Sequence, residues 1–450
     1  MVVAQQQQQH GLEWHEDRDW LYEELHSRPF QRISGDASIT HIAVLANQEE
    51  RAIQSQHIQH LLDTLNIEHD AVDQACNIYT AGDLRIRWEQ HLEFTSLTIT
   101  DSREGVASTQ PFFTTALDRL PDGWLSNYPG KAVAAFHMRI QTIQGDELPE
   151  PKDVRSQLDD MQMVGSLPQN GAAQIWTTFR THSDNFGRFL IYNNRMSKGQ
   201  MGRMVQRVIE VETYRLLALL GLREARKLSP VVADMDNRMA DLTRRLSTGD
   251  NSDDSRLLTE LINLSADIEA ERARTTFRFN ASRSYHDVMA ARLDELREDE
   301  VSGHLTLKEF LIRRLTPAVR GCETMHNRLD DLSRRVNRAA DMMRTRVEMA
   351  IENQNQELLS SMDRRSKIQL MMQHTVEGLS VAAISYYAVG LVKYLIDAVH
   401  SAGVDFDKSL ATGVSVPLVI SAVWFITRKI QNRFKKLAEV NTESTAKVGK

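Results

Sequence analysis

Three groups of residues in this 450-residue sequence combine types that could do chemistry. The first is Glu24–Phe30 (ELHSRPF), in which His26 stands between a glutamate and Arg28. A histidine beside a guanidinium and a carboxylate can bind phosphate or transfer a proton. Such residues also cap helix ends, and Pro29 favours an end here because the residue before proline disfavours the α region. We expect the structural role for His26.

The second group is Glu89, His91 and Glu93, within a stretch, Leu84–Thr100, whose apolar and polar residues alternate as in half-buried strands. Alternate residues of a strand share one face, so the three side chains would project together. That arrangement could bind a divalent cation, but no second cluster of ligands follows it. We expect a solvated strand face.

The third group lies on a predicted helix, Gly199–Leu222, whose spacings of three and four residues predict ion pairs along the helix surface. Its members are Arg203, Arg207, Glu210, Glu212, Tyr214 and Arg215. No GxxxxGK[ST], GxSxG, HExxH or GxGxxG pattern occurs in the chain. We therefore expect no catalytic residue, no cofactor site, no metal site and no enzymatic activity.

The composition of the chain limits the classes of protein to which it can belong. The two cysteines, Cys76 and Cys322, are far apart and belong to no CxxC motif or Cys/His cluster, which suits a reducing compartment and argues against structural zinc. The formal charge of −7 gives no basic footprint for nucleic acid. Residues 1–16 include a glutamine run without the apolar core of a signal peptide, and we expect them to be disordered.

The elements that position these groups change character near residue 195. Residues 17–194 alternate helical and strand-like segments and predict a cytoplasmic α/β domain with a partly antiparallel sheet. The predicted helices are Asp17–His26 and Glu49–Leu65, and the predicted strands are Thr40–Leu45, Ala132–Gln141, Ala173–Arg180 and Arg188–Tyr192. Residues 195–375 read as long helices: Gly199–Leu222, Ser229–Leu246, Leu257–Arg297, and an arm that begins at Leu305 and has Pro317 as a kink or restart point. The fold class is therefore α+β, with a long helical middle.

Apolar residues recur along the arm at alternating spacings of three and four, as in a coiled coil. This seam consists of Cys322, Met325, Leu329, Leu332, Val336, Ala340, Met343, Val347, Ile351, Leu358 and Met362, with Gln354 in a polar position. It could pair with a second copy of the chain or pack within an intramolecular bundle, and both remain open. The arginines of the arm could attract nucleic acid or anionic lipid, but interleaved acidic residues favour a solvated flank.

Two apolar segments, 378–396 and 409–427, lie within residues 376–430. Each has 19 residues, close to the roughly 20 needed to cross a bilayer. Lys393 lies near the end of the first segment and can reach the interface. The connector Asp397–Lys408 is acidic and both outer flanks, including the 431–450 tail, are basic, which predicts a two-pass hairpin with both termini in the cytoplasm. A buried helical hairpin of a soluble domain is the alternative.

Six blocks spread along the chain carry a resemblance to a known family. They are ELHSRPF, EQHLEF, GRMVQRVIEVETYRLLALLGL, FRFNAS, RTRVEMAIENQNQELLSSM and TVEGLSVAAISYY. Together they resemble the bacterial domain-of-unknown-function family 3422. The resemblance implies membrane anchoring in a bacterial inner membrane and brings no activity or functional residue. In layout the chain is also similar to CorA-type two-helix magnesium channels, but their Gly-Met-Asn motif is missing, and Lys393 near a pore mouth would repel cations.

These observations predict a membrane-anchored, non-catalytic scaffold or partner-binding protein of the bacterial cytoplasmic membrane. It would form a homo-oligomer through the helical arm, contact the lipid bilayer and bind no nucleic acid. The alternative is a CorA-like divalent-cation channel. A third possibility is an enzyme that uses the neighbourhood of His26 or His91.

Overall fold

A computed structural model describes residues 14–24, 29–70, 72, 75–103, 105, 111–143, 145, 147–248, 254–403 and 407–446, with side chains described as far as residue 430. The chain divides into two compact units, Met1–Met343 and Arg344–Lys450, which are treated separately below.

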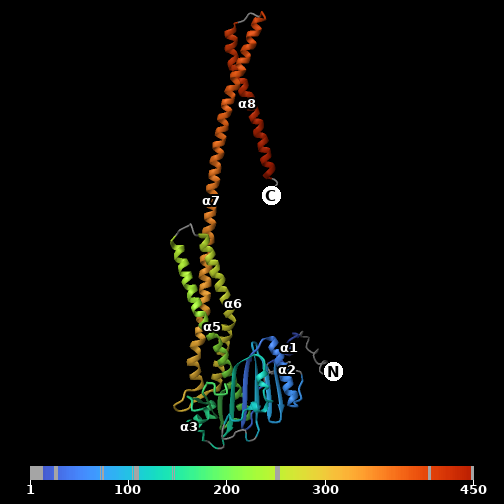
Figure 1. Ribbon diagram of the computed structural model, residues 1–450, viewed down its shortest axis with the longest axis vertical. Helices are drawn as coiled ribbons and strands as arrows, with labels where there is room; N and C mark the ends of the chain where they lie inside the picture. Colours follow the sequence, from blue (N-terminus) through green and yellow to red (C-terminus); the bar gives the residue numbers. More distant parts are fainter. Residues whose placement is uncertain are drawn as a thin grey trace. The chain divides into compact units, whose positions relative to one another are not determined.

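The described part of the first unit is built on a nine-stranded sheet of order β2-β3-β4-β1-β5-β8-β7-β6-β9 (Figure 1). The pairing of β5 with β8 is parallel and the other pairings are antiparallel. The strands are β1 Ala37–Leu45, β2 Cys76–Ala81, β3 Leu84–Gln90, β4 Phe94–Asp101, β5 Lys131–Thr142, β6 Val164–Leu167, β7 Ala173–Thr177, β8 Gly187–Asn193 and β9 Glu298–Glu300. The predicted α+β class with a partly antiparallel sheet is confirmed.

Helices cover both faces of this sheet and form a bundle beyond it. The α-helices are α1 Arg18–Glu24, α2 Gln48–Thr64, α3 Pro151–Arg155, α4 Pro168–Gly171, α5 Lys198–Thr248, α6 Asp254–Leu296, α7 Leu307–Ser401 and α8 Lys408–Ala446. Short 3-10 helices occur at Ala116–Arg119, Leu125–Asn127 and Ser156–Leu158. Asn47 and Glu50 form a capping box that fixes the start of α2.

Strand alternation sends two sets of side chains in opposite directions. Ile86 and Trp88 of β3 join a core with Ile58 and Leu61 of α2. On the opposite face of the sheet, apolar residues of β1 and β5 join a larger core with α5, α6 and the first turns of α7. The first half of α5 therefore lies against the sheet, where it can complete a site.

Helix α5 corrects one expectation. The segments Gly199–Leu222 and Ser229–Leu246, predicted as separate helices, form one 51-residue helix with Pro230 inside it. A proline removes one backbone donor and usually kinks or breaks a helix. The helix continues because Leu228 and Val232, on either side of the proline, are fully buried against α6 and α7. The burial of these neighbours thus outweighs the tendency of Pro230 to break the helix.

The upstream part of the predicted seam packs inside the first unit. Cys322, Leu329, Leu332, Val336 and Met343 of α7 form one core with residues of α5 and α6, and Figure 1 shows α5 and α6 side by side. For residues 322–343 the structure therefore supports the intramolecular bundle.

The described second unit contains the remainder of α7 and helix α8. Each of these helices contains a stretch long and apolar enough to cross a membrane, judged by length and composition alone. Almost none of either stretch is buried.

Candidate functional site

The segment that carries Glu89, His91 and Glu93 is a hairpin. Strand β3 ends at Gln90 and β4 begins at Phe94, and the His91 N–H donates to the Phe94 carbonyl at 2.9 Å. The expectation of one strand with all three side chains on one face is therefore wrong. No Gly, Pro, Asn or Asp marks this turn, which explains why the sequence pattern runs through it.

The three side chains have separate partners. Glu89 is buried and accepts a hydrogen bond of 2.8 Å from Arg87 Nη2. The His91 ring stacks on Phe94, with ring centroids 4.1 Å apart. Glu93 forms a two-pronged ion pair with Arg278 of α6, at 3.0 and 2.7 Å. Within the described residues no group of three or more His, Cys, Asp or Glu side chains could hold a metal ion.

Polar residues cluster on the sheet face that α5 covers. In the strand register, Arg87 of β3 lies opposite Thr98 of β4, and Thr98 lies opposite His41 of β1. Glu89 and Ser96 form the next pair on the same face. This polar row is buried under a helix, where it needs hydrogen-bond partners to offset its desolvation.

Helix α5, strand β4 and the segment before β1 supply these partners. The His41 ring hydrogen bonds through Nδ1 to the Thr98 hydroxyl at 2.8 Å and through Nε2 to the Thr213 hydroxyl at 3.1 Å. Arg87 Nη1 donates to the Pro29 carbonyl at 2.9 Å and, more weakly, to Gln206 Oε1 at 3.5 Å. The sheet and the helix thus form the two walls of a polar chamber.

The chamber encloses a cavity of about 280 Å³. Its sheet wall includes His41, Arg87, Glu89, His91, Phe94 and Ser96, and its helical wall includes Gln206, Ile209, Glu210, Thr213, Tyr214 and Arg292. Arg292 of α6 pairs with Glu210 and, at 2.7 Å, with Glu295. A concave site with convergent polar groups and displaced pKa values is the usual candidate for ligand binding, and we call it the sheet–α5 cavity.

The charged residues predicted to pair along α5 mostly form ion pairs with another helix. Only Glu212 and Arg215 form a predicted pair along α5, at 2.6 Å, and both side chains are largely buried. Arg207 pairs with Glu295 at 2.8 Å and Glu210 pairs with Arg292, so these contacts hold α5 to α6. Arg203 lies over the Phe30 ring at 5.0 Å. The spacing predicted charged pairs, but their partners on α6 are more than 80 residues away in sequence.

Burial controls the titration of His41. Desolvation, followed by the nearby His91 and Arg87, lowers the pKa of His41 from 6.5 to about 3. The neutral ring fits its position between two hydroxyl groups. In the unfolded chain the same ring takes up a proton below about pH 6.5.

This difference predicts acid sensitivity. As pH falls from 6.5 towards 3, the unfolded state gains a proton that folded His41 does not bind, so the free energy of unfolding decreases. Between pH 7.5 and 5 we expect His41 to account for a loss of about 2 kcal/mol, from about 1.4 kcal/mol per unit below pH 6.5. Urea denaturation across this range should show a shallower pH slope of the free energy of unfolding for His41→Gln than for the parent. Equal slopes for His41→Gln and the parent would contradict the assignment.

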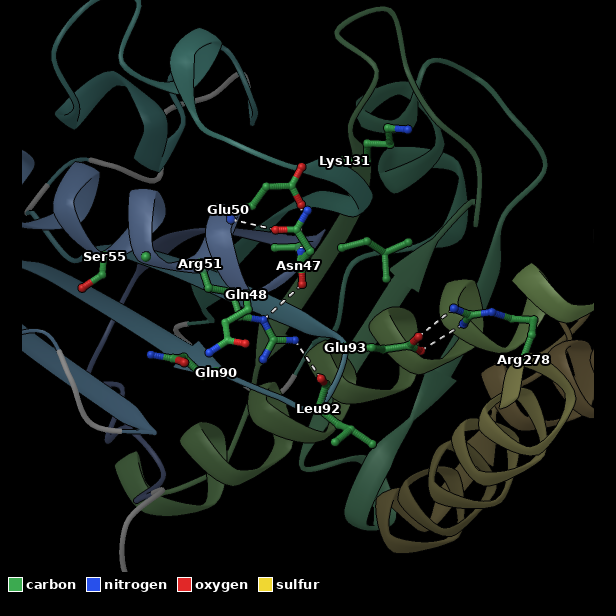
Figure 2. Close-up of a pocket in the computed structure, with 13 residues that line it drawn as sticks. Asn47, Gln48, Glu50, Arg51, Ser55, Gln90, Leu92, Glu93, Lys131 and Arg278 are labelled. Carbon is green, nitrogen blue, oxygen red and sulfur yellow. Dashed lines mark hydrogen bonds and ion pairs between the residues drawn. The ribbon is translucent and has the colours of Figure 1, made fainter. Parts of the chain in front are cut away.

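A larger and more open pocket, of about 950 Å³, lies at the tip of the hairpin (Figure 2). Figure 2 shows Arg51 of α2 reaching the Leu92 carbonyl, at 2.7 Å, and Glu93 directed at Arg278. Asn47 and Glu50 in its wall are engaged in the capping box. These contacts tie the hairpin to α2 and α6, and we assign the pocket a structural role.

Sequence reasoning missed His41, Arg87 and Arg292. The alternation Arg85-Ile86-Arg87-Trp88-Glu89 was a usable signal, because it places a charged face on a strand whose other face is apolar. Of the first predicted group, His26 and Arg28 lie outside the described residues.

Comparison with known proteins gives one match. The family model described as "Protein of unknown function (DUF3422)" matches residues 13–434. No curated protein and no solved structure matches the chain.

Proposed function

The chain belongs to the DUF3422 family of proteins of unknown function, and from this premise we propose that it is a non-catalytic, membrane-anchored scaffold of the bacterial cytoplasmic membrane. In this proposal the two apolar helical stretches anchor the chain with both termini in the cytoplasm. The downstream half of the α7 seam joins copies of the chain.

The anchoring part rests on length, composition and exposure. Residues 409–427 carry no charged side chain, and the stretches in α7 and α8 are almost entirely unburied within the described chain. A helical hairpin of a soluble domain would instead bury such segments. The flanking charges, Arg364, Arg365 and Lys367 before the pair and Arg428 and Lys429 after it, suit a cytoplasmic side.

The self-association part rests on a contrast within α7. In the first unit the seam residues Leu329, Val336 and Met343 are at most 1% exposed. Further along the same seam, Ile351, Leu358 and Met362 are 53%, 63% and 65% exposed. These exposed apolar residues keep the spacing of a coiled coil. They can therefore pack against the same residues of a second copy of the helix. This contrast is the observation that carries the proposal.

We expect the full-length chain in detergent to be a homo-oligomer by light scattering coupled to size exclusion. The double change Ile351→Asn/Leu358→Asn places amides in the seam and should raise the concentration for half-dissociation at least tenfold. The control Met349→Asn/Leu359→Asn changes exposed apolar residues of the same helix outside the seam and should leave assembly unchanged.

A parent chain that is monomeric at every concentration, or a control that dissociates as readily as the seam variant, would contradict the proposal. Uptake of Mg²⁺ by vesicles containing the parent chain, lost when assembly is lost, would instead favour the channel alternative.

A further inference from the structure

Helix α8 continues past its apolar stretch into a strongly basic segment. Residues 428–438 (RKIQNRFKKLA), which we call the α8 extension, directly follow the uncharged residues 409–427 and include five basic and no acidic residues. The helix runs without a break from Lys408 to Ala446, so the extension is helical. Arginine and lysine immediately beside a membrane span are attracted to anionic lipid headgroups.

The apolar residues of the extension recur with helical spacing. Ile430, Phe434 and Leu437 are separated by four and three residues, which places the three positions on one face of the helix. A helix with one apolar face and a face rich in lysine and arginine can lie in the plane of a membrane interface. At about 100° per residue, four of the five basic positions lie more than a right angle from the centre of the apolar face: Arg428, Lys429, Lys435 and Lys436.

Within the described chain, helix α7 leaves this face uncovered. In a helical hairpin the extension would lie against the turns of α7 that precede residue 378. Met371 and Val376 on those turns are exposed, and Ile430 of the extension is exposed as well. Arg364 and Arg365 of α7 carry the same sign of charge as the extension, which disfavours packing between them. The charge and the apolar face together fit an anionic lipid surface.

We propose that the α8 extension is a second membrane-binding element, which lies in the interface of the cytoplasmic leaflet and binds anionic phospholipid. The apolar face enters the boundary of the acyl chains, and the lysines contact headgroup phosphates. This inference rests on the proposed membrane anchoring. An anchor alone would let α8 continue along the bilayer normal, which would place Lys435 and Lys436 about 12–14 Å beyond Thr427, farther than the Debye length of about 8 Å.

Quenching of Trp424 fluorescence by brominated lipids tests the lipid preference. The full-length chain is reconstituted in vesicles in which either phosphatidylglycerol or phosphatidylcholine carries bromine on its acyl chains. Bromine quenches at short range, and Trp424 is the one tryptophan within residues 378–427. We expect phosphatidylglycerol to bind at least threefold more tightly than phosphatidylcholine.

Two double variants locate this preference. Lys435→Gln/Lys436→Gln should reduce the preference for phosphatidylglycerol by at least half. The matched control Arg364→Gln/Arg365→Gln also removes two positive charges, but from turns of α7 that lie about 20 Å before residue 378 along the helix. The control should keep the parental preference.

Spin labels report whether the extension lies in the interface. The native cysteines Cys76 and Cys322 are buried, so a label attaches selectively to an introduced cysteine. In phosphatidylglycerol vesicles a label at Phe434→Cys should be more accessible to oxygen than to a water-soluble nickel complex. A label at Asn432→Cys, two residues away and on the opposite side of the helix, should show the reverse.

Three results would overturn the inference and leave the anchor intact. They are equal quenching by the two lipids, a preference that Lys435→Gln/Lys436→Gln does not change, and equal nickel accessibility at positions 432 and 434. Absence of quenching by either lipid would contradict the proposed anchoring and the inference with it. Binding of a DNA oligonucleotide that is lost in Lys435→Gln/Lys436→Gln, with an unchanged lipid preference, would assign the extension to nucleic acid instead.

Discussion

Replacing Gly221 with alanine should lower the free energy of unfolding of the first unit by about 3 kcal/mol, combining overpacking with the loss of a buried hydrogen bond. Gly221 lies where α5, α6 and α7 meet. A Cβ atom there would lie 2.3 Å from Ser282 Oγ, 2.9 Å from Ser282 Cβ and 3.3 Å from Cys322 Sγ. The Gly221 N–H also donates to Ser282 Oγ at 3.1 Å. The helices must therefore separate or the serine must turn away.

The chain contains a matched control for this effect. Gly321 of α7 is also inside a helix, and a Cβ atom there would meet nothing within 4 Å. Gly321→Ala should therefore stabilise by up to about 1 kcal/mol, the helix-propensity difference between glycine and alanine. Adding Ser282→Gly to Gly221→Ala should restore part of the loss, since it removes the atoms that clash. Urea denaturation followed by tryptophan fluorescence measures the free energy of unfolding of the parent, the two single variants and the double variant. A gain in stability for Gly221→Ala would refute the close packing at Gly221.

The sequence predicted the long helices well because their apolar residues repeat over many turns. The boundaries of helices and strands were predicted wrongly where a local sequence signal disagreed with the tertiary structure. Pro230 suggested a break that the surrounding leucine and valine override, and the turn at His91 carried no turn residue. Strands β6 and β9, with four and three residues, are too short to show alternation.

The sheet–α5 cavity was less accessible to sequence reasoning because its contacts are nonlocal. His41 meets Thr98 and Thr213, which are 57 and 172 residues away. The strand order that places β1 beside β4 decides which residues line the chamber. Local alternation shows that Arg87 and Glu89 share a face, but not that α5 covers it. The polar character of the individual residues could therefore be predicted from the sequence, but their position side by side in one cavity could not.

Removing Arg87 alone should destabilise the first unit strongly. The Arg87 and Glu89 side chains are only 6% and 7% exposed and lie 2.8 Å apart. Losing one member of a buried pair leaves the other charge desolvated without compensation, which typically costs about 3–5 kcal/mol. We expect a loss of this size for Arg87→Met at pH 7.5, measured by urea denaturation. Arg85→Met, at a half-buried position on the same strand face, should change stability by less than about 1 kcal/mol.

The double variant Arg87→Met/Glu89→Leu tests whether the cost comes from the stranded carboxylate. A buried ion pair replaced by apolar residues of similar volume is often neutral or stabilising, so the double variant should recover most of the loss of Arg87→Met. Failure to recover would mean that Arg87 stabilises chiefly through its other partners, which include the Pro29 carbonyl and Gln206. In that case Glu89→Leu alone should be nearly neutral. If the ion pair dominates instead, Glu89→Leu should also destabilise the first unit, because Arg87 would then be a buried charge without its counterion.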